Sequence, residues 1–435
     1  MPADAELLAR SADLKQELIA FAEDEQFSVA LAQFRVEHLV ESPGDAEPGS
    51  EQSADDKSRA EESPDVDSRA INVLDAFILQ HQLPDGKTPL EHFVAAHSEL
   101  SGADRELMLG WRDVVEGIFT VQKRDGDALL VDNLIDELMY RIRSPQGRSA
   151  FAQLAGGSFL VARLVPIGDE WLISGAHSIM PWISAGVAYR LAAELAVGNP
   201  TLVFRNPANV ARAWKMQEEE RNDFIAFFGS DVVILTGGEL DERMRAYAHY
   251  QIYESKDSEG KTVAERASRI YGAIPQPPDP DLPDGITQAE SVGVVFDEVD
   301  GLKFLPNYRL VVDAFTDPDQ LSDERHRDVV RSYFGDRDIS PRVLTRLAGA
   351  DPERASRVVQ RVLDRAGFSW ADSGEVLLNE MKAAYYAAPV LPGVTPLGEE
   401  LARARIAGTA KLGPAPKTHA VRQQLRNAGK RRKHK

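Results

Sequence analysis

The sequence contains no Cys among its 435 residues. This absence excludes disulfide bonds, thiol catalysis, Cys-ligated zinc and Cys-ligated iron–sulfur clusters, and it argues against a secreted disulfide-stapled domain. No uninterrupted apolar run reaches the ~18 residues that a membrane-spanning helix needs. The first residues, "MPADAELLAR", carry acidic groups where a signal peptide would be basic and then apolar. We therefore expect a cytoplasmic protein without membrane contact.

Sequence patterns that mark metal and nucleotide sites are also lacking. Neither the HExxH pattern nor an EF-hand loop occurs, and His92 and His97 are five residues apart, which puts them on different faces of a helix. The nearest approach to a phosphate-binding loop is "ILTGGELDERM", which lacks the Lys-Ser/Thr pair of such a loop. We interpret Gly237 and Gly238 as a turn that precedes a helix. The negative charge of Glu239 complements the positive N-terminal end of that helix. The sequence predicts no metal and no cofactor.

Two pairs of side chains have the chemistry of catalytic groups without a catalytic pattern. Ser174 lies three residues from His177, and Asp132 lies four residues from Asp136. Closeness in sequence does not bring a nucleophile and a base together, and nothing marks these carboxylates as having a raised pKa. We therefore name no catalytic residue and expect a binding protein rather than an enzyme. An unrecognised hydrolase or nucleotide-binding enzyme is the alternative.

Charge is distributed unevenly along the chain, whose net charge is −19. Residues 411–435 contain nine Lys or Arg and no acidic residue, whereas residues 41–69 contain ten acidic and three basic residues. Setting aside these segments of +9 and −7 leaves −21 for the rest of the chain. An acidic body repels nucleic acid, so only the C-terminal segment is well placed to attract it.

Composition and hydrophobic periodicity divide the chain into helical, β-rich and linker segments. Residues 41–69 are rich in Pro, Ser, Asp and Glu, and five Pro occur between Pro275 and Pro283, so we interpret both stretches as linkers. The predicted segments are a helical segment (1–40), an acidic disordered linker (41–69), a helical cap with a small β-barrel module (70–181), a helical region (182–274), a Pro/Asp-rich linker (275–288), a β-hairpin with a helical domain (289–400) and a basic flexible tail (401–435).

The stretch "SFLVARLVPIGDEWLISG" predicts two strands joined by a tight turn. One face of its first strand carries Leu160, Ala162 and Leu164, and the other face is also mostly apolar, so we expect both faces to be covered. With the hairpin signal Asp125-Gly126, these strands indicate a small SH3-like or OB-like barrel. The predicted fold class is α+β: a helical N-terminal region, this barrel, a helix-rich C-terminal domain with a β-hairpin, and a disordered basic tail.

The C-terminal half contains a second hairpin signal and several helix starts. "VGVVFDEVDGLKFLPNYRLVVDAFTDP" predicts two apolar strands around a turn at Asp300-Gly301. Ser340-Pro341 and Asp351-Pro352 each place an N-cap residue before a Pro in the first helical turn. We therefore expect helices to follow the hairpin.

The order of these segments resembles that of a group of uncharacterised bacterial proteins. The resemblance covers most of residues 70–400 and is carried by "GIFTV", "FLVARLVPIGDEWLISG", "FFGSDVVIL", "LPNYRLVVDAF" and "FSWADSGEVLL". Some members of such groups end in a Cys-rich zinc motif. This chain has Lys and Arg at that place and no Cys, so the resemblance implies neither a zinc site nor an activity.

Basic residues occur in two places that suit nucleic-acid binding. Small barrels bind RNA, DNA or peptides through aromatic and basic side chains, here with Phe119 and Tyr140 as candidate aromatics. The alternative is that the aromatics belong to the core and the charges protect sheet edges. The C-terminal segment would neutralise phosphates, or else act only as a solubilising tail. The predicted nucleic-acid-binding residues are Lys123, Arg124, Arg141, Arg143, Arg163, Arg422, Arg426, Lys430, Arg431, Arg432, Lys433 and Lys435.

These observations favour an adaptor that associates with RNA, the ribosome or DNA through its basic tail. A scaffold for a protein partner is the alternative, with contacts on the acidic linker and the helical surfaces. The two are distinguished by whether the association survives removal of nucleic acid.

Overall fold

The computed structural model describes residues 5–39, 64–180, 184–257, 259–272, 274–280, 282 and 284–409. The described residues form two compact units. The first, unit 1, comprises those of Met1–Ala196 with Leu397–Ala404, and the second, unit 2, comprises those of Val197–Pro396 with the residues from Arg405. Among these residues, no helix combines the length and apolarity that crossing a membrane requires.

Unit 1 begins with helices that share one hydrophobic core. This core includes Leu14 and Leu18 of the first helix and Phe77 and Ile78 of the third, all with no exposed surface. Thr88 starts the fourth helix by accepting a hydrogen bond from the Glu91 backbone N–H, as the Thr-Pro pair predicts. The helices of this core are α1 (Ala5–Ala22), α2 (Glu25–Leu39), α3 (Pro64–Gln80), α4 (Pro89–Ala96) and α5 (Gly102–Gly110). Helices α6 (Ala185–Gly198) and α17 (Glu399–Thr409) come later in the chain, after the barrel.

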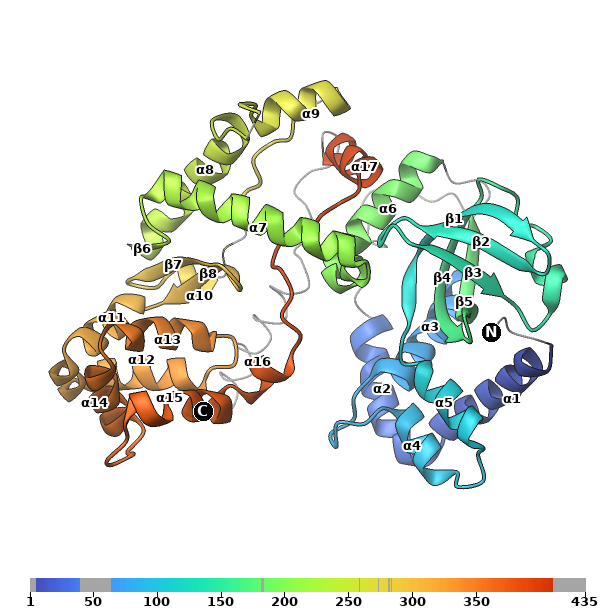
Figure 1. Ribbon diagram of the computed structural model, residues 1–435, viewed down its shortest axis with the longest axis horizontal. Helices are drawn as coiled ribbons and strands as arrows, with labels where there is room; N and C mark the ends of the chain where they lie inside the picture. Colours follow the sequence, from blue (N-terminus) through green and yellow to red (C-terminus); the bar gives the residue numbers. More distant parts are fainter. Residues whose placement is uncertain are drawn as a thin grey trace, which may run out of the picture. The chain divides into compact units, whose positions relative to one another are not determined.

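A closed five-stranded barrel follows these helices, with the strand order β1-β2-β3-β5-β4 (Figure 1). All neighbouring strands are antiparallel except β3 and β5, which are parallel. This Greek-key order, with a short 3-10 helix (Gly147–Phe151) between β3 and β4, is that of an OB-like rather than an SH3-like barrel. The strands are β1 (Val115–Asp125), β2 (Ala128–Asn133), β3 (Met139–Arg143), β4 (Phe159–Ile167) and β5 (Glu170–Met180).

Strand β4 is covered on both faces, as its doubly apolar sequence predicts. Leu160, Ala162 and Leu164 belong to the core inside the barrel. Val165 and Ile167 belong to the helical core, and α3 packs on β5 while α5 packs on β4 (Figure 1). The β4–β5 hairpin is therefore shared between the barrel and the helices of unit 1.

Unit 2 is built around a three-stranded antiparallel sheet with the order β6-β7-β8. Its middle strand contributes Val292, Val294 and Phe296 to one core and Val295 to another, because alternate side chains of a strand point to opposite faces. Helices α7 and α8 contribute to the first core, and α11 to α15 form the second. The strands are β6 (Val232–Leu235), β7 (Val292–Asp297) and β8 (Gly301–Pro306).

Two helices of unit 2 begin at the N-caps that the sequence indicates, since Ser340 and Asp351 cap α13 and α14. Helix α8 begins at Gly237, where Thr236 forms a capping box with Glu239 that we did not predict from the sequence. The helices are α7 (Pro207–Phe228), α8 (Gly237–Tyr253), α9 (Val263–Tyr271), α10 (Asp284–Thr287), α11 (Tyr308–Thr316), α12 (Glu324–Gly335), α13 (Pro341–Ala350), α14 (Pro352–Val362), α15 (Trp370–Met381) and α16 (Ala383–Ala387), with 3-10 turns at Pro200–Arg205 and Pro318–Ser322.

Four segments differ from the sequence-based expectation. Helix α3 starts at Pro64, inside the expected acidic linker, and α17 runs to Thr409, inside the expected tail. The Pro-rich stretch 275–288 separates no domains, since β6 before it pairs with β7 after it. The end of the predicted second hairpin, from Tyr308 on, is helix α11, because its buried residues recur at helical spacing rather than alternating.

Candidate functional site

The predicted basic residues of the barrel lie on different strands and have different partners. Lys123 and Arg124 end β1, Arg141 and Arg143 belong to β3, and Arg163 belongs to β4. Lys123 is exposed. The predicted residues of the C-terminal segment, from Arg422 to Lys435, lie outside the described residues.

Arg163 is not available to a nucleic acid, which corrects the prediction for this residue. Its side chain is 5% exposed and donates hydrogen bonds to Asp75 (3.0 Å), Glu116 (2.8 Å) and Gln80 (2.6 Å). A guanidinium enclosed in this way is paired with carboxylates of its own chain and shielded from other partners. The sequence did not indicate that Arg163 is a buried ion-pair partner, because none of its three partners lies near it along the chain.

Most of the other basic residues of the barrel are also held by neighbouring groups. Arg141 pairs with Asp125 and with Glu170 (2.5 Å), and Arg143 lies 3.6 Å from the same Glu170 carboxylate. Arg124 donates to the backbone carbonyls of residues 151, 152 and 154, which ties β1 to the segment before β4. These contacts tie the parts of the barrel together, and the carboxylates offset the charges of Arg141 and Arg143.

The candidate aromatic residues of the barrel are core residues. Phe119 has no exposed surface and Tyr140 is 3% exposed. Tyr140 donates its hydroxyl to Asp136 (2.6 Å), which also accepts from Asn133 and has no exposed surface. Asp136 therefore organises the turn between β2 and β3, and the side chains of these two aromatics are not available for stacking on bases.

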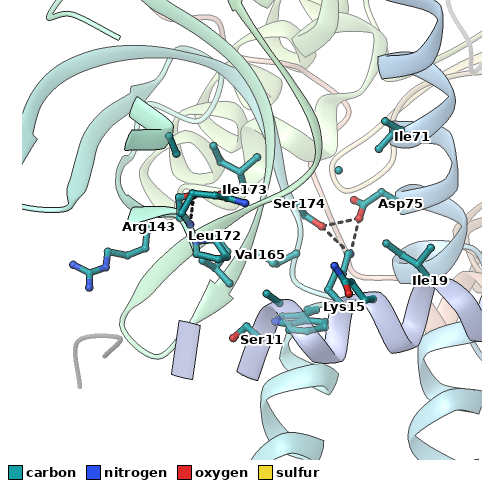
Figure 2. Close-up of a pocket in the computed structure, with 18 of the residues that line it drawn as sticks. Ser11, Lys15, Ile19, Ile71, Asp75, Arg143, Val165, Leu172, Ile173 and Ser174 are labelled. Atoms are coloured by element: carbon teal, nitrogen blue, oxygen red, sulfur yellow. Dashed lines mark hydrogen bonds and ion pairs between the residues drawn. The ribbon is translucent and has the colours of Figure 1, made fainter. Parts of the chain in front are cut away.

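A cluster of polar side chains lies where the helices of unit 1 meet β5, and the sequence did not reveal it. Lys15 Nζ of α1 donates to Asp75 Oδ1 of α3 (2.7 Å) and to Ser174 Oγ of β5 (2.9 Å). Ser174 in turn donates to Asp75 (2.6 Å), and Arg163 donates to the other Asp75 oxygen (3.0 Å). We refer to Lys15, Asp75, Arg163 and Ser174 as the Asp75 cluster; Figure 2 shows Lys15, Asp75 and Ser174 with the hydrogen bonds between them.

Helix and strand geometry brings this cluster together. Asp75 lies on the apolar face of α3, between Leu74 and Ile78. Because this face packs against the core, the Asp75 side chain is directed into the protein. At Gly175, β5 comes so close to α3 that a Cβ would lie 2.6 Å from Asn72 Oδ1. Gly175 also has a φ of +73°, which favours glycine. An acidic residue inside an apolar stripe was the sequence signal for this site.

Asp75 is ionised in this environment. It is 3% exposed, and burial alone would raise the pKa of its carboxyl. The positive charges of Lys15 and Arg163, with hydrogen bonds from Lys15 and Ser174, outweigh burial and lower the pKa below its usual value. A carboxylate held in this way is a poor base, so it does not activate Ser174 as a nucleophile.

The Lys15–Ser174 contact has the distance of a Ser–Lys pair but not its hydrogen-bond direction. Lys15 Nζ donates to Ser174 Oγ and the Ser174 hydroxyl donates to Asp75, so the serine proton is not directed at the lysine nitrogen. The predicted neighbour of Ser174, His177, has its side chain outside the described part of the structure. The geometry therefore supports binding and structural roles for the Asp75 cluster.

A cavity of about 380 Å³ opens beside the Asp75 cluster. It lies between α1, α3, Trp111, β4, β5 and the segment that follows β3. Figure 2 shows the lining side chains of α1, α3, β4 and β5 that it labels. Its wall is mostly apolar, and its charged lining residues are Lys15, Asp75 and Arg143. The indole Nε1 of Trp111, a residue 1% exposed, is buried without a hydrogen-bond partner.

The other candidate sites named from the sequence are structural. Gly237 and Gly238 are the first residues of α8 rather than a turn before it. Glu239 accepts from the backbone N–H of Thr236, and a Cβ on Gly237 would lie 2.3 Å from the Thr287 carbonyl oxygen, so Gly237 allows close packing. His92 pairs with Asp85, and His97 stacks on Phe93. Within the described residues, no group of three or more His, Asp or Glu is placed to hold a metal ion.

Comparison with known proteins adds no relative: no protein-family model, no curated protein and no solved structure matches this chain.

Proposed function

We propose that this protein is a non-enzymatic adaptor that associates with nucleic acid through its C-terminal segment. The observation that carries the proposal is the charge of residues 411–435, which contain nine Lys or Arg and no acidic residue. Such a segment neutralises phosphates and releases their counterions, whatever the base sequence. The proposal includes a cytoplasmic location, which the lack of Cys favours.

The pairing of basic side chains in the barrel supports the choice of this segment. Arg124, Arg141 and Arg163 all bind groups of their own chain, and the residues outside 41–69 and 411–435 carry a net charge of −21. An acidic body repels a polyanion, so the attraction has to come from the C-terminal segment. The body would then remain available to other partners of the adaptor.

The test is binding of single-stranded RNA by the full chain and by residues 1–410 across a series of salt concentrations. If nine charges pair with phosphates, the slope of log K against log salt reaches about −6 for a single strand. We expect residues 1–410 to lose most of the affinity and the salt dependence. A full-length variant with all nine Lys and Arg of the segment changed to Gln separates charge from chain length and should behave like residues 1–410.

Equal binding by the full chain and by residues 1–410 would contradict the proposal, as would a flat salt dependence. A scaffold for a protein partner is then the function to pursue. Its signature is a pull-down from lysate that survives nuclease treatment, whereas the proposed association is lost when the nucleic acid is digested.

A further inference from the structure

The cavity beside the Asp75 cluster has the size and the wall of a site for a small apolar molecule. Its volume of about 380 Å³ falls in the range of pockets that hold small organic ligands, ~300–1,000 Å³. Figure 2 shows Ile19 and Ile71 on the helical side and Leu172 on the strand side. Trp111 lines the cavity with its ring rather than with its indole nitrogen, which is buried.

The charged side chains beside the cavity are balanced within the chain. Lys15 and Arg163 both pair with Asp75. Arg163 also pairs with Glu116, so this group contains two cations and two carboxylates. A charged ligand would add a charge that the group does not compensate, and moving such a charge out of water costs free energy.

Arg143, which also lines the cavity, is balanced in the same way. Its guanidinium lies 3.6 Å from the Glu170 carboxylate, which also pairs with Arg141. Arg141 pairs in turn with Asp125, so this second group again contains two cations and two carboxylates. The lining therefore favours an uncharged ligand over an anion or a cation.

Lys15 offers the cavity a hydrogen-bond donor. Its Nζ uses two of three N–H groups on Asp75 and Ser174, and the part of the chain that the structure describes places no acceptor at the third. The centre of the Trp111 ring lies 5.7 Å from Nζ, so the ring attracts the ammonium without replacing a hydrogen bond. The Lys15 side chain is 21% exposed, so a ligand oxygen in the cavity can reach this N–H.

A carbonyl oxygen suits this donor better than a hydroxyl group does. It accepts a hydrogen bond and brings no donor of its own. A hydroxyl group would bring a further donor to a site whose carboxylate, Asp75, already accepts from three groups. The ligand that fits is thus uncharged, apolar over most of its length and provided with a carbonyl oxygen.

We propose that this cavity binds a small uncharged molecule with an aliphatic body and a carbonyl oxygen, which accepts a hydrogen bond from Lys15 Nζ. The aliphatic body lies against the isoleucine, leucine and valine side chains of α1, α3, β4 and β5. Ile71 lines the cavity and is 49% exposed, so it marks the edge through which the ligand enters. Unit 1 is then a ligand-binding module that the chain carries in addition to its C-terminal segment.

The experiment titrates the full chain with methyl heptanoate, an uncharged ester, and with octanoate and octylammonium as charged molecules of similar length. Calorimetry measures the three affinities. We expect the ester to bind saturably and about tenfold more tightly than either charged molecule, because the lining compensates neither added charge.

The infrared carbonyl band of the bound ester reports the donor. A hydrogen bond from an ammonium lowers the carbonyl stretching frequency below its value in an alkane solvent. We expect the lowered frequency in the wild type, and an alkane-like frequency with about tenfold weaker binding in Lys15→Met. The wild-type band tests the donor even where Lys15→Met does not fold.

A variant at the edge of the cavity localises the binding. Ile71→Trp narrows the cavity at a partly exposed position and should weaken binding of the ester about tenfold. The matched control is Ile270→Trp on α9 of unit 2, a residue of similar exposure (42%), which should leave the affinity unchanged.

Each of four results would overturn the proposal. The first is no saturable binding of the ester at millimolar concentration, and the second is octanoate or octylammonium binding as tightly as the ester. The third is an alkane-like carbonyl band in the wild type, and the fourth is equal affinity of Ile71→Trp and the wild type for the ester. None of these readouts depends on RNA, so this proposal and the nucleic-acid proposal fail separately.

Discussion

Asp75 is the carboxylate that pairs with both Lys15 and Arg163, and Arg163 has a second carboxylate partner in Glu116. Asp75 accepts from Lys15, Ser174 and Arg163 at 2.6–3.0 Å, and Arg163 is itself 5% exposed. Removing one member of a buried ion pair leaves the other charge without compensation, which costs more than the pair contributes. The stability of unit 1 should therefore depend strongly on this carboxylate.

We expect Asp75→Asn to lower the free energy of unfolding by about 3 kcal/mol, because it leaves Lys15 and Arg163 facing a neutral amide. Urea denaturation of the full chain, followed by circular dichroism, measures this change. The matched control is Glu380→Gln, which removes a carboxylate from an exposed pair with Arg365 and should change stability little. Equal effects of the two substitutions would show that burial of the Asp75 cluster does not matter.

The pH dependence of the same variant follows from the lowered pKa of Asp75. A carboxyl with a folded-state pKa below its unfolded value, about 3.9, stabilises the protein above that pH and loses this contribution as the pH falls through the folded pKa. The stability difference between wild type and Asp75→Asn should therefore be constant from pH 5 to pH 8 and shrink below about pH 4. A difference that shrinks near neutral pH would contradict the ion-pair account.

At the scale of elements, the packing of β5 on α3 positions the polar cluster. Glycine at position 175 permits this packing for two reasons. Its φ is +73°, and the space beside Asn72 and Asp75 is too small for a Cβ. The Asn72 side chain accepts from the Ala176 backbone N–H at 2.9 Å, which fixes the strand to the helix. A bulkier residue at 175 would push the strand away from α3 and lengthen these bonds.

We expect Gly175→Ala to destabilise the chain by about 2–3 kcal/mol, through backbone strain and the clash with Asn72 together. Gly126→Ala is the control for strain alone, because Gly126 has a φ of +64° and nothing within 4 Å of an added Cβ. That variant should cost about 1 kcal/mol. Chemical denaturation of both variants tests the difference, and equal losses would mean that the close approach of β5 to α3 contributes nothing.

At the scale of the whole molecule, each unit is assembled from segments that are distant in sequence. In unit 2, β6 pairs with β7 across the Pro-rich stretch 275–288. Phe224 and Leu240 before this stretch share a core with Val292 and Phe296 after it. The two parts therefore depend on each other for burial of their apolar side chains.

We expect the two parts of unit 2 to stay associated after the chain between them is cut. A protease recognition sequence inserted between Gln276 and Pro277 allows the cut at an exposed position. Because the β6–β7 pairing and the shared core remain, the fragments should elute together in size-exclusion chromatography and separate only in denaturant. Separation under native conditions would mean that 275–288 is a linker between independent domains.

The local organisation of the chain could largely be predicted from its residues. The helix starts at Ser340 and Asp351 and the hairpin turn at Gly126 follow the sequence signals. Each of these features depends on backbone groups within a few residues, so a short stretch of sequence is enough to predict it. The two covered faces of β4 follow for the same reason, since its side chains alternate and both sets are mostly apolar.

Arrangement over long distances needed the three-dimensional structure. The parallel pairing of β3 with β5 distinguishes an OB-like from an SH3-like barrel. The sequence of neither strand indicates this pairing. Lys15 and Asp75 are 60 positions apart, and Asp75 and Ser174 are 99 apart. Whether a charged side chain is paired, buried or exposed depends on which segments the core brings together, and burial is a property of the whole fold. For this reason the sequence predicted Arg163 to be an accessible cation, whereas in the folded chain it is a buried ion-pair partner.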